Sequence, residues 1–420
     1  MKTIVERPVY LQKLIDRRNN GEIKIITGSR RCGKSWLLTR LYKNWLLSQN
    51  VKEENIIILS FDMNDELNNE KLLDSTELKK YLYERMKDDI EEYYVFLDEI
   101  QEVQNFERIV NGLNSHDNID VYITGSNSKF LSSDINTLFR GRGDEIRVFP
   151  LSFKEFCSAK AEDIRTLWKE YYTYGGLPSL LHQKTKEQKI SFLQRLWSKT
   201  YIDDVLERNN IKNREALDSI VDALCSSIGS LTNSLRIKNI LESVMHVKLD
   251  SETVKKYIDF LQNAYLFESA QRYNIKGNKY YDSVKKYYAV DVGLRNAKLN
   301  FRQQEITHIM ENIIYNELRM RDFLVDVGVV EARKMVNGKS EFLQYEVDFI
   351  ATNGTEKYYI QSAYAIPDDI KREQEITSLK KINDSFRKIV IVNDDIEMYT
   401  DNNGIIYVGL LQFLMSDKII

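Results

Sequence analysis

Short apolar runs alternate with longer amphipathic stretches through the first 150 residues of this 420-residue chain. The runs are rich in β-branched and aromatic side chains, as buried parallel strands are, and the stretches between them have helical periodicity. We therefore predict an α/β domain with a parallel sheet between helices and its ligand at the carboxyl ends of the strands. The predicted strands are IKIIT at 23–27, IIILSFD at 56–62, YYVFLD at 93–98 and VYIT at 121–124, and RPVYLQKLIDRR at 7–18 is predicted as a preceding helix.

From residue 152 to 210 the pattern is that of helices, interrupted at Gly175-Gly176-Leu177-Pro178. Two glycines and a proline can simply end a helix, or they can aim the helical segment at a ligand of the first domain, and the sequence leaves both readings open. Residues 211–297 read as helix, turn and helix, followed by two strands around a turn at Gly277, which predicts a winged helix. From residue 300 the order is helix, strands, helix and strands, which predicts a further α/β domain.

The junction of the first strand with its helix carries the pattern G-x-x-x-x-G-K-[ST], the signature of a phosphate-binding loop. Glycines at 28 and 33 allow backbone N–H groups to turn toward phosphate oxygens. Lys34 adds a positive charge for the β and γ phosphates, and the Ser35 hydroxyl can join a Mg²⁺ shell. The predicted phosphate-binding residues are Gly28, Ser29, Arg30, Arg31, Cys32, Gly33, Lys34, Ser35 and Trp36.

The strand at 93–98 ends in the acidic pair Asp98-Glu99, which is the Walker B pattern. We expect Asp98 to hold Mg²⁺ with Ser35, and Glu99 to act as the general base that polarises the attacking water. An acidic turn at a strand end is common in isolation, but here it follows the phosphate loop with another predicted strand between them. The pair therefore predicts hydrolysis of the nucleotide as well as binding.

Two further groups of candidates surround this predicted site. If the strand at 121–124 inserts between those at 23–27 and 93–98, its end lies beside the γ-phosphate, and Thr124, Ser126 or Asn127 can sense it. Asn127 and Ser126 are favoured, and the sequence does not separate them. Arg140 and Arg142 flank a glycine and are candidates for an arginine finger reaching a neighbouring subunit, with an ordinary surface role equally open. By position alone, Arg7 and Tyr10 are expected to touch the base or ribose.

The composition narrows the class of protein further. A net charge of −3 argues against a basic nucleic-acid coat, although it leaves room for a local basic face. Cys32, Cys157 and Cys225 lie far apart, and the four histidines have no metal spacing, so we expect neither disulfides nor a zinc site. No apolar run is long enough to span a bilayer, and we expect a cytoplasmic protein without a membrane partner. Cys32 is interpreted as a small loop residue, with redox control of nucleotide binding as the alternative.

These motifs together resemble the prokaryotic AAA+ ATPases that carry a C-terminal domain of unknown function, DUF4143. The resemblance rests on the phosphate loop and on several segments further along the chain. They are FLDEIQ at 96–101, ITGSNS at 123–128, the RGR loop with PLSFKEF at 150–156, YGGLP at 174–178, KYYAVDVGLRNA at 286–297 and EN-x-x-Y-x-EL at 311–318. It implies an ATPase core at 1–150 and a helical lid at 151–210, before the winged helix at 211–297 and the α/β domain at 298–420.

The last domain resembles the restriction-endonuclease-like PD-(D/E)xK core. Glu311 and Asp348 match two acidic positions that gather Mg²⁺ beside a scissile phosphate. The third position departs from the pattern, because the chain has Gln361-Ser362-Ala363 where an active enzyme has E-x-K. An amide binds metal poorly and a methyl group cannot stabilise charge, so we expect a nuclease-like site without nuclease activity.

The leading hypothesis is therefore a Mg²⁺-dependent ATP-binding and ATP-hydrolysing switch of the AAA+ type, coupled to the C-terminal half. ATP is preferred to GTP because the chain lacks an N-K-x-D guanine motif. One alternative is an ATP-regulated DNA-binding protein in which hydrolysis is minor, and a minor alternative is an ATP-dependent nuclease. A second copy of the chain or another protein is the other expected kind of partner. The basic residues that could meet DNA phosphates are Lys255, Lys256, Arg272, Lys276 and Lys279.

Overall fold

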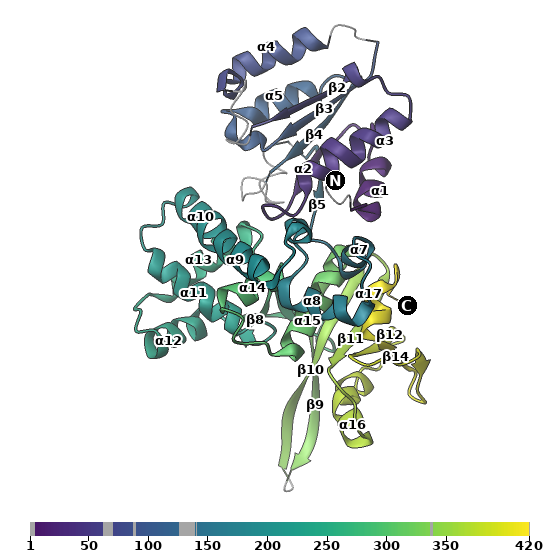
Figure 1. The fold of residues 1–420 in the computed structure, drawn as a ribbon. Coiled ribbons are helices and arrows are strands. Elements are labelled where there is room, and N and C mark those ends of the chain that lie inside the picture. The colour runs from purple at the N-terminus through teal and green to yellow at the C-terminus, as the bar shows by residue number, and fades with distance from the viewer. Residues whose placement is uncertain are drawn as a thin grey trace. The chain divides into compact units, whose positions relative to one another are not determined.

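Figure 1 shows the fold of the protein as a computed structural model. It describes residues 5–61, 70–86, 90–125, 139, 141–336 and 339–419. The chain divides into two compact units, which are described separately below. The first comprises the residues up to Pro150 together with Asn263–Tyr265, and the second comprises Leu151–Gln262 together with Leu266 onward.

The first unit is built on a five-stranded sheet in the order β2-β3-β4-β1-β5. All of its strand pairs are parallel, and β4 lies between β1 and β3, as the sequence predicted for the strand at 121–124. The predicted α/β class with a parallel sheet is therefore confirmed. The strands are β1 (Ile23–Thr27), β2 (Ile56–Ser60), β3 (Tyr93–Asp98), β4 (Ile119–Thr124) and β5 (Gly143–Arg147).

Helices connect these strands, and the one that follows the phosphate loop is irregular. It begins as α2 (Lys34–Trp36), widens to a π-helix over Leu37–Tyr42 and continues as α3 (Lys43–Ser48). The sequence predicted a helix there and did not reveal its wider turns. The remaining helices of this unit are α1 (Pro8–Asp16), α4 (Ser75–Arg85) and α5 (Phe106–Leu113), with 3₁₀ turns at Glu53–Asn55, Glu70–Leu73 and Ile100–Glu102.

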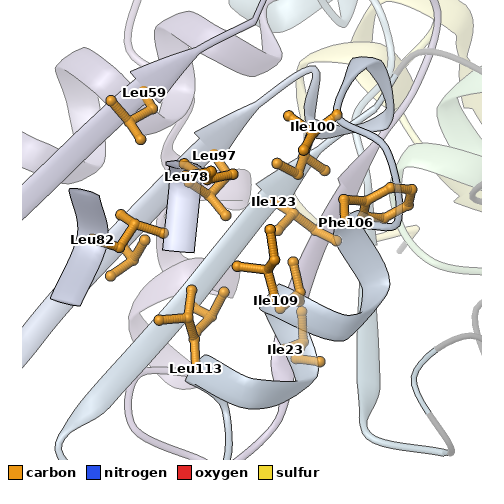
Figure 2. Packing of buried hydrophobic residues seen from close by; sticks show 14 of the residues in the cluster. Ile23, Leu59, Leu78, Leu82, Leu97, Ile100, Phe106, Ile109, Leu113 and Ile123 are labelled. Atoms are coloured by element: carbon orange, nitrogen blue, oxygen red, sulfur yellow. The ribbon is translucent and has the colours of Figure 1, made fainter. Parts of the chain in front are cut away.

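Two apolar cores hold the helices against the faces of this sheet. Figure 2 shows the one in which α4 contributes Leu78 and Leu82 and α5 contributes Phe106, Ile109 and Leu113. The i, i+3 and i+4 spacing of these residues places them on one face of each helix. The cores fix β1, β3 and β4 relative to one another, which sets the geometry of the site at their carboxyl ends.

The second unit begins with the helices that the sequence predicted from 152 to 210. They are α7 (Phe153–Ser158), α8 (Ile164–Tyr174), α9 (Lys186–Leu196) and α10 (Ile202–Arg208), with a 3₁₀ turn at Pro178–His182 and a π-helical turn at Trp197–Tyr201. Further helices are α11 (Arg214–Ser226), α12 (Ser234–Val244), α13 (Ser251–Asn263), α14 (Val292–Lys298), α15 (Ile306–Met320), α16 (Asp369–Lys380) and α17 (Leu410–Met415). No helix in the described part of the chain is long and apolar enough to cross a membrane.

A nine-stranded mixed sheet in the order β13-β14-β12-β11-β10-β9-β7-β8-β6 runs through the second unit. Parallel pairing of β7 with β9 makes the sheet continuous across residue 297, the predicted boundary between the last two domains. The four-part division therefore stays a prediction, while the end of the first unit at Pro150 coincides with its first boundary. The strands are β6 (Leu231–Thr232), β7 (Phe267–Asn274), β8 (Lys279–Ala289), β9 (Leu324–Val336), β10 (Lys339–Asn353), β11 (Glu356–Ala363), β12 (Arg387–Val392), β13 (Tyr399–Thr400) and β14 (Ile405–Gly409).

Candidate active site

The phosphate loop lies between β1 and α2 with the backbone geometry its glycines were predicted to provide. Gly28 has φ 140°, and a Cβ there would lie 2.1 Å from the Val148 carbonyl oxygen. Gly33 has φ 104° and precedes α2. Lys34 is buried, and its Nζ donates to the carbonyl oxygens of Gly28 and Ser29 at 2.9 and 3.1 Å. An ammonium group is therefore fixed within the loop, close to backbone that only glycine can supply.

Asp98 ends β3 beside the loop and accepts two side-chain hydrogen bonds on Oδ1. Ser35 Oγ donates to it at 2.9 Å, and Thr124 Oγ1 at the end of β4 donates at 2.5 Å. Burial raises the pKa of the Asp98 carboxyl, and the bonds from Thr124 and Ser35 partly oppose this rise. The two residues predicted to hold Mg²⁺, Ser35 and Asp98, are thus hydrogen-bonded to each other.

Glu99 follows with a left-handed backbone, φ 53°, which is uncommon for a residue with a side chain. Its N–H donates to Thr124 Oγ1 at 2.9 Å, so one hydroxyl positions both acidic residues. Glu99 Oε1 is 4.0 Å from Lys34 Nζ, and Gln101 Nε2 donates to Glu99 Oε2. The sequence analysis did not assign a role to Gln101, although it belongs to the quoted FLDEIQ segment.

Arg7 and Tyr10 contact the backbone around the phosphate loop. Arg7 is 2% exposed, and its guanidinium donates to the carbonyl oxygens of Cys32, Phe149 and Pro150 at 3.0, 3.0 and 3.3 Å. Its charge lies 4.4 Å from the centre of the Tyr10 ring, and the Tyr10 hydroxyl accepts from Phe149 N at 3.2 Å. The hydrogen bonds of Arg7 and Tyr10 connect the phosphate loop to the segment that follows β5. Contact of these two residues with a base or ribose stays a prediction.

The other loop residues differ in exposure. Cys32 is fully buried in an apolar core, in keeping with the interpretation of a small packing residue. Ser29 is also buried, and its hydroxyl has no hydrogen-bond partner among the described residues. Arg30 and Trp36 are half-buried and Arg31 is exposed, with φ 62°. Their contacts with phosphate or nucleotide stay predictions.

Arg142 lies far from the phosphate loop of its own unit. It directly precedes β5, and its carbonyl accepts from Ile23 N at 2.8 Å, at the amino end of β1. The loop follows the carboxyl end of β1, five residues further on, which corresponds to about 16 Å at the rise of a strand. Arg142 is exposed, so its predicted role as an arginine finger requires a phosphate of another copy. Ser126, Asn127 and Arg140 lie outside the described residues.

The residues present fit a nucleotide phosphate chain with Mg²⁺. Lys34 is a fixed cation with three N–H donors, and the unpartnered Ser29 hydroxyl offers a further donor in the same loop. Ser35 and Asp98 supply a hydroxyl and a carboxylate in contact, which are hard oxygen ligands of the kind Mg²⁺ prefers. These groups lie together at the carboxyl ends of β1 and β3, and their binding of nucleotide and Mg²⁺ stays a prediction.

The second predicted site is filled by a lysine that the sequence analysis did not assign. Lys286 on β8 lies with its Nζ 2.9 Å from Glu311 Oε1, 2.8 Å from Glu346 Oε1 and 3.5 Å from Asp348 Oδ1. Gln361 follows Ile360, which pairs with Phe349, so Gln361 lies beside Asp348 on adjacent strands. Lys286 is the first residue of the segment KYYAVDVGLRNA, and this segment was the sequence feature that could have pointed to it.

Mg²⁺ does not fit this second site as it stands. The lysine ammonium lies where the carboxylates of Glu311, Glu346 and Asp348 converge. Within the described ranges, no group of three or more His, Cys, Asp or Glu side chains is arranged to hold a metal ion, so the three carboxylates would have to move closer together to bind one. The fold-family expectation of a Mg²⁺ site is therefore not supported at Glu311 and Asp348.

Comparison with known proteins agrees with the geometry of the first unit. Residues 20–157 match an AAA domain, and residues 165–305 match a domain of unknown function, DUF8612. The Walker-type ATPase PABY2304 of Pyrococcus abyssi superimposes with a TM-score of 0.50 at 15% identity, covering 70% of this chain and 96% of that chain. The N-terminal unit is therefore a P-loop NTPase of the AAA type, and the predicted DUF4143 assignment of the C-terminal part stays a prediction.

Two relatives match along the whole chain. An uncharacterized protein of Haemophilus influenzae is 34% identical over 420 residues, which are 99% of this chain and 100% of that protein. The uncharacterized protein MJ1544 of Methanocaldococcus jannaschii is 27% identical over an alignment of 431 positions that covers 99% of this chain and 88% of that protein. The chain belongs to the same family as the Haemophilus influenzae protein.

Proposed function

We propose that the N-terminal unit hydrolyses ATP with Mg²⁺ and that the chain uses its nucleotide state as a molecular switch. The observation that carries the proposal is the hydrogen bond of 2.9 Å between Ser35 Oγ and Asp98 Oδ1, beside the buried Lys34 ammonium. Asp98 supplies the carboxylate that Mg²⁺ needs, and the adjacent Glu99 supplies a second one. A site for binding alone has no use for that second carboxylate.

Each residue has a distinct task in this proposal. Lys34 and the loop N–H groups bind and orient the phosphates, Ser35 and Asp98 hold Mg²⁺, and Glu99 accepts a proton from the attacking water. Bound Mg²⁺ would neutralise negative charge on the phosphates. Gln101 positions Glu99 by donating to Oε2, and Thr124 positions both acids.

Phosphate release by the purified full-length protein tests the proposal. Wild type is compared with Lys34→Ala and Glu99→Gln, with MgATP in excess. Glu99→Gln keeps the shape of the side chain but cannot accept a proton, so we expect turnover to fall at least about 100-fold, the usual contribution of a general base. Lys34→Ala should lose nucleotide affinity as well. Equal rates in all three proteins would refute the proposal.

We further propose that the hydrolysis acts on the C-terminal half, which combines a winged helix with a nuclease-like domain that does not cleave. The order α11, β6, α12, α13, β7, β8 supports the winged-helix interpretation. The order α15, β9, β10, β11, α16, β12 supports the PD-(D/E)xK-like interpretation. Gln361 and Ala363 stand where cleavage needs a carboxylate and a lysine.

A second candidate function is ATP-regulated DNA binding. It is favoured by the exposure of Lys255 and Lys256 on α13 and of Lys276 and Lys279 at the β7–β8 turn. Arg272, by contrast, is half-buried and donates to Gln344 at 3.0 Å. Binding through these lysines should weaken steeply with salt and depend on nucleotide. Fluorescence anisotropy with duplex and single-stranded DNA, on wild type and Lys255→Ala/Lys256→Ala, measures both; affinity unchanged by ATP would exclude this function.

A further inference from the structure

The carboxylate cluster of the second unit combines side chains from three separated elements. Glu311 comes from α15, and Glu346 and Asp348 come from β10, while the single cation Lys286 comes from β8. Lys286 and the two acids Glu311 and Asp348 are at most 11% exposed as side chains, and Glu346 is 35% exposed. Three carboxylates thus share one lysine in a largely buried place.

Hydrogen bonds from the protein itself engage Glu311 and Asp348, although the neighbouring Gln361 Oε1 and Ser362 Oγ are buried without a partner among the described residues. Glu311 Oε1 accepts from Lys286 at 2.9 Å and from Tyr288 Oη at 2.7 Å. Asp348 Oδ2 accepts from Ser362 N at 2.8 Å. The three carboxylates lie on the side of the ammonium that would otherwise face a scissile phosphate or a metal ion, and they compete for its three N–H donors.

The electrostatic surroundings keep this lysine charged. Burial lowers the pKa of Lys286, but Glu311, Asp348 and Glu346 together more than reverse this and hold its pKa above the usual value. Burial raises the pKa of Asp348, against the opposing effect of Lys286, and the neighbouring carboxylates raise it further. Among the described residues, Lys286 is the cation that these acids contact, and without it they would have to bind protons or another cation.

We propose that Lys286 is the resident cation of the Glu311–Glu346–Asp348 cluster and that its ammonium keeps a divalent metal ion out of this cluster. The ion pairs of Lys286 link β8 to α15 and β10. They neutralise the three carboxylates, as a bound metal ion would in a metal site. The cluster is then a structural junction within the nine-stranded sheet, and it takes up no Mg²⁺ or Mn²⁺ in the native protein. The inference rests on the contacts of Lys286 and is independent of ATP hydrolysis.

Mn²⁺ binding without nucleotide tests this proposal in the full-length chain. All proteins carry Asp98→Asn, which silences the metal ligand of the phosphate loop. Lys286→Met removes the ammonium at similar length, and Lys298→Met is the matched control, because Lys298 Nζ also lies near two acids, 3.0 Å from Asp218 and 3.3 Å from Asp222. The readouts are Mn²⁺ bound per chain by electron paramagnetic resonance and the unfolding temperature with and without Mn²⁺.

The proposal predicts no Mn²⁺ bound to Asp98→Asn alone and one Mn²⁺ bound after Lys286→Met is added. Mn²⁺ should raise the unfolding temperature of the Lys286→Met protein by more than about 4 °C, which corresponds to a Mn²⁺ concentration roughly 5- to 30-fold above its dissociation constant in a unit of this size. It should not do so for Lys298→Met. If Lys286→Met unfolds without metal, recovery of the fold in millimolar Mn²⁺ gives the same support, and failure to recover contradicts the proposal.

Two other results would overturn the proposal. One is Mn²⁺ bound to Asp98→Asn alone and lost on adding Asp348→Asn, because Lys286 would then leave room for the metal. The other is a folded Lys286→Met protein that neither binds Mn²⁺ nor is stabilised by it. Metal-dependent plasmid cleavage by wild type that Lys286→Met abolishes would instead make Lys286 a catalytic residue.

Discussion

Thr124 lies between the two carboxylates that the proposed hydrolysis uses. Its hydroxyl donates to Asp98 Oδ1 at 2.5 Å and accepts from the N–H of Glu99 at 2.9 Å. Because Glu99 has a left-handed backbone, this bond helps hold a conformation that costs energy. We infer that Thr124 is a positioning residue for both acids, in addition to being one of the predicted sensor candidates.

Replacing Thr124 by valine tests this role. Valine has nearly the same shape but neither donates nor accepts, so Asp98 and Glu99 each lose a bond. We expect kcat for ATP to fall about 10-fold or more, the usual effect of removing a group that orients a ligand. Thr124→Ser keeps the hydroxyl and should restore most of the rate. Equal activity of Thr124→Val and wild type would show that the hydroxyl does not position the acids.

Two of the quoted sequence segments, YGGLP at 174–178 and KYYAVDVGLRNA at 286–297, pack against each other in the second unit. Asp291, the N-cap residue of α14, accepts from Gly176 N at 2.8 Å and from Leu294 N at 2.9 Å. Asn296 on α14 donates to the carbonyl oxygens of Tyr172 and Thr173, both at 2.9 Å. The segment YGGLP therefore ends α8 against α14, and its glycines give α14 close access to the backbone.

Gly175 tests this contact between the two helices. It has φ 81°, and a Cβ there would lie 2.2 Å from Asp291 Oδ1. Gly404 is a control for positive φ, because its φ is 74° and nothing lies within 4 Å of its Cβ position, whereas Gly175 also has ψ −171°, which side chains rarely adopt. Gly404→Ala should cost about 1–2 kcal/mol of backbone strain. Gly175→Ala should lower the free energy of unfolding at least twice as much, and the loss should include hydrogen-exchange protection of α14. An equal loss in both variants would show that the close approach of Gly175 to Asp291 is unimportant.

Asp291 also makes the stability of this junction depend on pH. Burial raises its pKa to about 6, despite the backbone hydrogen bonds that oppose the rise. A carboxyl whose folded pKa exceeds its unfolded value binds more protons in the folded state, so its contribution to stability falls as pH rises from about 4 to about 6. The free energy of unfolding of wild type relative to Asp291→Asn should therefore decrease across this range in urea titrations. A constant difference would mean that Asp291 does not titrate there.

At the scale of the whole molecule, the structure confirms the predicted parallel sheet of the first unit, while the winged-helix and nuclease-like assignments of the second unit stay predictions. Strand runs, the phosphate loop and Asp98-Glu99 are local patterns, and the parallel sheet follows from them. The hydroxyl of Thr124 and the amide of Gln101 act through tertiary contacts, so their roles were not readable beforehand. Lys286 and Glu311 are 25 residues apart on different elements, and only the folded sheet brings them together.

On the prediction that Arg142 is an arginine finger, its position means that active sites are completed between copies of the chain. Arg142→Ala and Glu99→Gln should each be nearly inactive alone. In an equimolar mixture, an Arg142→Ala site with a functional Glu99 can receive Arg142 from a Glu99→Gln neighbour, so part of the ATPase rate should return. Solution mass with and without ATP serves as the control for assembly. If Arg142→Ala alone retains wild-type activity, the residue is an ordinary surface arginine.

The measurement that tests the central claim most directly is a single-turnover reaction with MgATP bound to excess protein. It follows cleavage of the bound nucleotide and is therefore independent of product release. We predict that wild type converts its bound ATP to ADP, while Glu99→Gln binds ATP with similar affinity and cleaves it at least about 100-fold more slowly. Cleavage at the same rate by both proteins, with binding intact, would contradict the account.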